Sequence, residues 1–173
     1  MVTLTIDLIG NKAQSAGMHF SHLMRNIPRP FSADHGHEAR QFFAADGEEI
    51  QDFVAAVAGS SPYLKGLIEK EHQWLRGAFA QPDAALKVEF SELKATADSY
   101  LMSALRRAKR RVALWTALCD LAGVWALEEV TEALSKFADL ACQISLNHAL
   151  KVQLQRGKIP TRKPETDPAG LGM

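Results

Sequence analysis

The sequence predicts an all-α fold, a long antiparallel helical hairpin with shorter N-terminal helices packed on it. Apolar residues between positions 91 and 156 recur at spacings of three and four, the period of one helix face. Strand-like alternation is confined to Leu4, Ile6 and Leu8, and no partner strand is recognisable later in the chain. With 173 residues, 47% of them hydrophobic, the chain is long enough to bury one core.

Two apolar stripes predict the arms of the hairpin. The first predicts one helix of about thirty residues, roughly 45 Å long, that ends at Gly123. The second begins after Val124 and Trp125, and so short a connection predicts that the two helices fold back on each other. The first stripe comprises Leu101, Leu105, Ala108, Val112, Trp115, Leu118 and Ala122, and the second comprises Val130, Leu134, Phe137, Ala141, Ile144, His148 and Val152.

Turn and breaker residues divide the chain into three parts. Residues 1–34 are predicted to be a poorly ordered lead, because Pro28 and Pro30 interrupt any helix there. Residues 35–158 are predicted to form the helical domain, within which Ser60-Ser61-Pro62 is a helix-start signal. Residues 159–173, with three prolines among charged residues, are predicted to be a linker toward an absent catalytic domain.

Composition excludes several classes of protein. Lys and Arg number 20 and Asp and Glu number 20, so the net charge is zero, which argues against a general nucleic-acid binder. The longest apolar run, Val112 to Leu127, contains Asp120 and is shorter than the ~20 residues of a membrane span. Cys119 and Cys142 lie in apolar helical stretches and are predicted to be reduced core thiols, which indicates a cytoplasmic protein.

A cluster of five cations lies around Ala108 on the first stripe: Arg106, Arg107, Lys109, Arg110 and Arg111. At about 100° per residue, Arg106 and Arg110 are predicted to point away from the core while the other three flank it. The cluster is either a solvated face, pairing with Glu residues on neighbouring helices, or a contact for phosphate or an acidic partner surface. Nucleic acid is the weakest of the alternatives, since no aromatic platform accompanies the cluster.

Metal ligation and catalysis have little support in the sequence. Residues 34–38 hold Asp34, His35, His37 and Glu38, but we expect a solvated loop there, which makes a metal-dependent hydrolase a remote hypothesis. His148 lies on an apolar stripe and is predicted to be a hydrogen-bonded core histidine. We identify no nucleophile elbow, phosphate loop or HExxH motif, and therefore predict no catalytic residue and no metal ligand.

Four strings resemble one family in order and spacing, over roughly residues 40 to 156. The family is the bifunctional glutamine synthetase adenylyltransferase and adenylyl-removing enzyme, and the matching part is similar to its N-terminal helical lead-in. The strings are Gly59-Ser60-Ser61-Pro62-Tyr63-Leu64, Leu105-Arg106-Arg107-Ala108-Lys109-Arg110-Arg111, residues 117–128 (ALCDLAGVWALE), and Leu134-Ser135-Lys136-Phe137-Ala138-Asp139.

The resemblance implies an enzyme that adds AMP from ATP to a tyrosine of glutamine synthetase and removes it by phosphorolysis. It implies glutamine synthetase and the PII signal protein as partners, and magnesium and ATP as cofactors of the full-length enzyme. Such enzymes hold magnesium with an Asp-x-Asp pair after a Gly-Ser turn, and this chain contains no Asp-x-Asp. We therefore expect this chain alone to need no cofactor and to be a non-catalytic fragment; the alternative is a free-standing interaction module with a basic helix face.

Overall fold

The computed structural model describes residues 18–158, and every regular element in that range is helical, which confirms the all-α prediction. The elements are α1 (Phe20–Leu23), α2 (Ala33–Gln41), α3 (Glu48–Ser60), α4 (Pro62–Ala80), α5 (Pro82–Lys94), the 3-10 helix η1 (Asp98–Tyr100), α6 (Leu101–Leu121) and α7 (Leu127–Gln155). None of these helices is both long and apolar enough to cross a membrane. Predictions for the first strand-like stretch and for the linker at 159–173 lie outside the described residues.

Helix α4 begins where the sequence predicts. The Ser61 hydroxyl accepts a hydrogen bond from the backbone N–H of Leu64 at 3.3 Å, and Pro62 occupies the first helical position. A serine cap satisfies a backbone donor at the helix start, and proline there has no N–H to satisfy. The helix-start prediction is confirmed.

The single helix of about thirty residues predicted before Gly123 is wrong. Two helices, α5 and α6, occupy that range, and residues 95–100 with η1 separate them. Short polar side chains favour the break because they bond to nearby backbone: the Thr96 hydroxyl donates to the Glu92 carbonyl, and the Ser103 hydroxyl to the Tyr100 carbonyl. The end of α6 agrees with the prediction, since Gly123 adopts φ +65° just beyond it.

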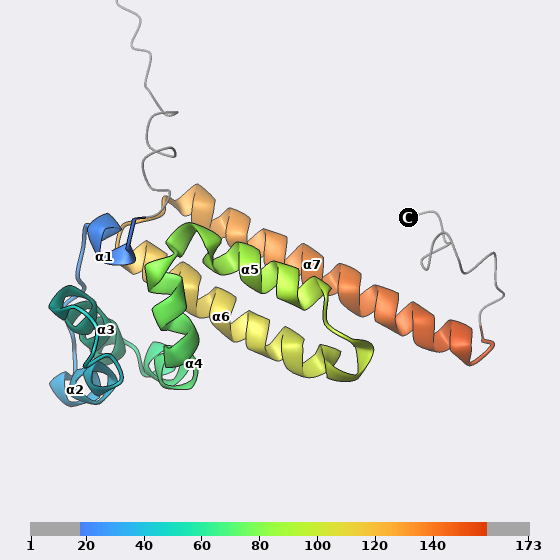
Figure 1. Ribbon diagram of the computed structural model, residues 1–173, viewed down its shortest axis with the longest axis horizontal. Helices are drawn as coiled ribbons and strands as arrows, with labels where there is room; N and C mark the ends of the chain where they lie inside the picture. The colour runs from blue at the N-terminus through green and yellow to red at the C-terminus, as the bar shows by residue number, and fades with distance from the viewer. Residues whose placement is uncertain (1–17, 159–173) are drawn as a thin grey trace, which may run out of the picture.

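Figure 1 shows α5, α6 and α7 side by side, with α6 and α7 running in opposite directions, while α2, α3 and α4 gather toward one end. Residues 122–126 connect α6 to α7. Because α5 also packs on both α6 and α7, the long helices form a three-membered layer rather than two arms alone.

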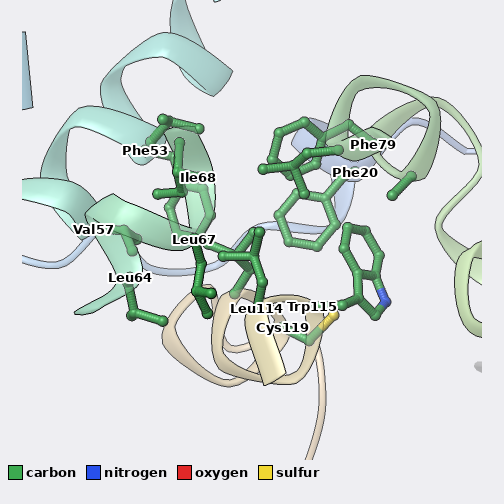
Figure 2. Close-up of a cluster of buried hydrophobic side chains, with 14 of the residues drawn as sticks. Phe20, Phe53, Val57, Leu64, Leu67, Ile68, Phe79, Leu114, Trp115 and Cys119 are labelled. Atoms are coloured by element: carbon green, nitrogen blue, oxygen red, sulfur yellow. The ribbon is translucent and has the colours of Figure 1, made fainter. Parts of the chain in front are cut away.

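Aromatic side chains from four helices make the centre of the core. Phe20, Phe53, Phe79 and Trp115 are at most 1% exposed. The Phe20 ring lies 5.1 Å from the rings of both Phe79 and Trp115, between centroids (Figure 2). Tilted aromatic pairs at this separation add to the stabilisation from buried area.

Phe20 corrects the boundary of the predicted lead. Residues 18–34 belong to the folded domain, because α1 places Phe20 in the core and later backbone groups are bonded. The N–H groups of Arg25 and Asn26 donate to the Ala122 carbonyl, and those of Phe31 and Ser32 donate to the Gly59 carbonyl. These hydrogen bonds hold the extended segment from Arg25 to Ser32 at both ends, although no strand pairs with it.

The two cysteines occupy different environments. Cys119 is 1% exposed in the core, as predicted. Cys142 is exposed on α7, so the prediction of a second core thiol is wrong. Burial raises the pKa of the Cys119 thiol well above its usual value, and the nearby charge of Glu129 adds to this shift.

Candidate functional site

The basic cluster lies in the N-terminal half of α6, and its five side chains have three different environments. Arg106 and Lys109 are exposed. Arg107 is half-buried, and its Nε is covered with no hydrogen-bond partner. Arg110 and Arg111 reach toward α4 and α5, where two buried carboxylates receive them. The cluster is therefore not a uniform solvated face.

Glu71 and Glu89 are the carboxylates that bind the arginines. Arg110 Nε donates to Glu71 Oε1 at 2.7 Å, and Arg111 Nε donates to Glu71 Oε2 at 2.9 Å. Arg111 Nη1 donates to Glu89 Oε2 at 2.7 Å. The side chains of Glu71 and Glu89 are 5% and 1% exposed. This four-residue network, called the α6 clamp below, joins α4, α5 and α6.

Charge and packing both hold Arg111 in the clamp. Its guanidinium lies 5.2 Å from the centre of the Trp74 ring, within cation–π range. Burial lowers the pKa of Arg111, but hydrogen bonds to Glu89 and Glu71 outweigh burial and leave the pKa raised. Each buried carboxylate thus has a permanently charged donor, which offsets much of its desolvation.

Arg110 corrects the predicted orientation of the cluster. We predicted that it points away from the core, yet its guanidinium reaches Glu71 and its side chain is 39% exposed. Helical spacing fixes only the direction of the Cα–Cβ bond, and a long arginine side chain can fold back along the helix surface. Arg106 is exposed, as predicted.

The buried carboxylates were not singled out from the sequence, although a signal for them exists. Glu71 lies three residues after Ile68 and four before Leu75, both of which are fully buried. Glu89 likewise lies between Leu86 and Leu93 at helical spacings. An acid in register with an apolar stripe, in a chain with a separate arginine cluster, predicts a buried ion pair.

The histidine-rich segment has a helical structure in place of the predicted loop. Residues 34–38 lie within α2. Glu38 pairs with Lys65 Nζ at 2.8 Å, and hydrogen bonding from Lys65 lowers the pKa of Glu38. Among residues 18–158, no three His, Cys, Asp or Glu side chains are grouped so that they could hold a metal ion. The described residues therefore do not fit a metal centre.

His148 lies half-buried on α7 opposite η1. Its Nδ1 is 3.6 Å from Oδ1 of Asp98, and Lys151 Nζ lies 2.5 Å from the other carboxylate oxygen, Oδ2. Lys151 lowers the pKa of Asp98 by this hydrogen bond. The Nδ1 atom has no hydrogen-bond partner, so His148 is not the hydrogen-bonded core histidine that the stripe predicts.

Comparison with known proteins defines the family. The family model described as "Glutamate-ammonia ligase adenylyltransferase" matches residues 50–173 of this chain. The chain belongs to this family. The match includes α4, α5, α6 and α7 and therefore the whole α6 clamp. No solved structure matches this chain.

Curated relatives carry the name "Bifunctional glutamine synthetase adenylyltransferase/adenylyl-removing enzyme". One from Rhodopseudomonas palustris (strain TIE-1) is 35% identical over 131 residues, which is 72% of this chain and 13% of the relative. One from strain ATCC BAA-98 / CGA009 is 35% identical over 150 residues, 82% of this chain and 15% of the relative. One from Bradyrhizobium diazoefficiens is 33% identical over 129 residues, 71% and 13% respectively. The chain therefore spans about one seventh of the length of these relatives.

Proposed function

We propose that this chain is a non-catalytic helical scaffold of an enzyme that adenylylates and de-adenylylates glutamine synthetase. Family membership and the names of the relatives support the reaction and its protein substrate. Within such an enzyme, the chain would correspond to the helical lead-in of the adenylyl-removing half. The same assignment implies a role in nitrogen regulation, a cytoplasmic location and PII as a second partner.

The main support for the scaffold role is that the buried carboxylates of this chain bind arginines of the same chain. Nucleotidyl transfer depends on acidic side chains that hold divalent metal at the reacting phosphate. In this chain Glu71 and Glu89 are instead bound by Arg110 and Arg111, and they join three helices. We assign the use of magnesium and ATP to other parts of the full-length enzyme.

The exposed part of the cluster supports a partner contact. Arg106 and Lys109 point to solvent, and neither forms an ion pair within the described residues. Exposed cations of this kind bind acidic protein surfaces and speed their association. We assign Arg106 and Lys109, with Arg107 beside them, to contact with an acidic region of glutamine synthetase or PII, and Arg110 and Arg111 to the clamp.

A phosphorolysis assay tests the scaffold role. The purified chain is mixed with adenylylated glutamine synthetase, magnesium and phosphate, and ADP release from the tyrosine–AMP bond is measured. We expect no release above the enzyme-free background, whereas a full-length relative should release ADP under the same conditions. Turnover by this chain alone would contradict the scaffold role.

Binding measurements test the partner contact and the alternative of a free-standing interaction module. Titration of glutamine synthetase and of PII with Arg106→Glu/Lys109→Glu should show weaker binding than with the unmodified chain, and the difference should shrink at high salt. Lys87→Glu/Lys94→Glu, an equal charge change at two exposed positions of α5, is the control. Tight binding to PII alone, without glutamine synthetase, favours the module.

A further inference from the structure

Arg107 differs from the other members of the basic cluster because part of its charged group is removed from water without a partner. Its Nε is covered and has no hydrogen-bond acceptor. Within residues 18–158 its guanidinium forms no ion pair either. By contrast, Arg110 and Arg111 donate to the carboxylates of the α6 clamp. A buried donor without an acceptor costs free energy, and the cost is larger for a charged group, so an acceptor from outside this chain would recover it.

The charges around Arg107 also call for an anion. Arg110 and Arg111 face two carboxylates in the clamp, which balances their charge. Arg106, Arg107 and Lys109 form no ion pair within the described part of the chain. Arg107 lies three residues before Arg110 and four before Arg111, and side chains at these spacings adjoin on a helix surface. Like charges at such positions repel, and a carboxylate at Arg107 would offset this repulsion.

We infer that Arg107 anchors the partner contact by binding a carboxylate, from an Asp or Glu in an acidic segment of the partner protein, through Nε and one Nη nitrogen. This inference rests on the partner contact proposed above and names the residue and the ligand group. The planar guanidinium presents these two donors side by side, in a geometry that matches the two oxygens of a carboxylate. Arg111 already binds carboxylates of this chain through Nε and Nη1.

A covered donor and an exposed charge contribute to binding in different ways. Arg107 is half-buried, whereas Arg106 and Lys109 are exposed. Exposed charges attract an acidic surface and speed association, and salt screens them. An arginine that is desolvated in the complex instead slows dissociation and contributes a large share of the binding free energy. Arg106 and Lys109 therefore attract the partner, and Arg107 holds it.

NMR spectra of the arginine Nε–H groups test the carboxylate site directly. The probe is a hexaglutamate peptide at millimolar concentration, and a hexaglutamine peptide is the control. Hexaglutamate should shift the Arg107 Nε–H signal, which is assigned by its loss in Arg107→Lys, and should slow its exchange with water. The Arg111 signal should stay in place, because its Nε already donates to Glu71. No shift at Arg107, or a shift with inorganic phosphate but not with hexaglutamate, would overturn the proposal.

Binding of the Arg107→Lys variant to glutamine synthetase and to PII tests the anchor. Lysine retains the positive charge but cannot form the two parallel hydrogen bonds. We expect binding to weaken about tenfold, mainly through faster dissociation, and the loss to persist at high salt because the charge is unchanged. Arg29→Lys, the same substitution at an exposed arginine outside the cluster, is the control and should bind like the unmodified chain. Circular dichroism should show equal helicity in all three chains.

The two experiments separate the role of Arg107 from the identity of the partner. If the unmodified chain binds glutamine synthetase or PII but Arg107→Lys binds as tightly as Arg29→Lys, Arg107 is not the anchor, although the partner contact stands. If the chain binds neither protein while hexaglutamate shifts the Arg107 signal, the carboxylate site stands and the proposed partners are wrong.

Discussion

Arg111 and Glu89 form a buried ion pair in which Nη1 donates to Oε2 at 2.7 Å and the Glu89 side chain is 1% exposed. Replacing Arg111 with Leu would leave Glu89 ionised, buried and unpaired. Losing one partner of a buried pair costs about 3–5 kcal/mol. We expect the free energy of unfolding of Arg111→Leu, measured by urea denaturation, to fall by about that amount.

Two variants show whether the loss comes from the unpaired charge. Lys109→Leu changes an exposed cation on the same helix and should alter the free energy of unfolding by less than about 0.5 kcal/mol. Glu89→Leu combined with Arg111→Leu removes both charges and should recover part of the stability that Arg111→Leu loses. A double variant less stable than Arg111→Leu would mean that packing around Trp74 matters more than charge.

Arg106 and Arg110, one helical turn apart, should respond differently to the same substitution. Arg106→Gln changes an exposed side chain, so we expect a change in the free energy of unfolding of less than about 0.5 kcal/mol. Arg110→Gln removes the hydrogen bond to Glu71 Oε1, but Arg111 still serves Glu71, so we expect a loss of about 1 kcal/mol. Thermal and urea unfolding measure both losses. Equal losses for Arg106→Gln and Arg110→Gln would contradict the role of Arg110 in the clamp.

The elements predictable from sequence are those set by local chemistry. Pro62 after a capping serine specifies the start of α4, and Gly123 specifies the end of α6, because each residue acts on backbone a few positions away. The all-α class follows from the helical period of the apolar residues. Two of the four family strings, residues 59–64 and 117–128, lie at such points, so the resemblance and the local signals agree there.

Features that depend on distant residues were not predictable in this way. Phe20 lies in a segment of weak local signal, and its burial depends on the distant aromatic rings of Phe53, Phe79 and Trp115. The break at residues 95–100 lies within an apolar period that continues across it, so the period alone conceals it. Likewise, the buried state of Glu71 requires arginines about forty positions away.

Gly36 should be intolerant of any side chain. A Cβ at this position would lie 2.6 Å from the Ala55 carbonyl oxygen, which is backbone of α3 and cannot rotate away. Gly36→Ala must therefore push α2 and α3 apart, and overpacking of this kind costs about 1–3 kcal/mol. Chemical denaturation should show this loss, with native-state hydrogen exchange faster in α2 than in α6.

Gly66 provides the matched comparison. It lies inside α4, and a Cβ there would meet nothing within 4 Å. Alanine is favoured over glycine in a helix by roughly 0.5–1 kcal/mol, so Gly66→Ala should stabilise the chain. If both alanine variants changed stability in the same direction, the close approach of α2 and α3 at Gly36 would not be the cause.

The Cys119 thiol should make stability fall at alkaline pH. Its pKa is raised in the folded chain, chiefly by burial, while an unfolded cysteine ionises near pH 8.5. Between these two pKa values the folded state holds a proton that the unfolded state has released. The stabilisation is therefore fully present below about pH 8.5 and decreases above it, by up to about 1.4 kcal/mol per pH unit.

Two cysteine variants test this source of the pH dependence. Cys119→Ala should remove this part of the fall in the free energy of unfolding with pH, whereas Cys142→Ala, at an exposed thiol, should retain it. Denaturation curves from pH 7 to 10 measure the slopes, and Ellman's reagent should modify Cys142 alone in the folded chain; rapid modification of Cys119 without unfolding would show that the thiol is not shielded from solvent.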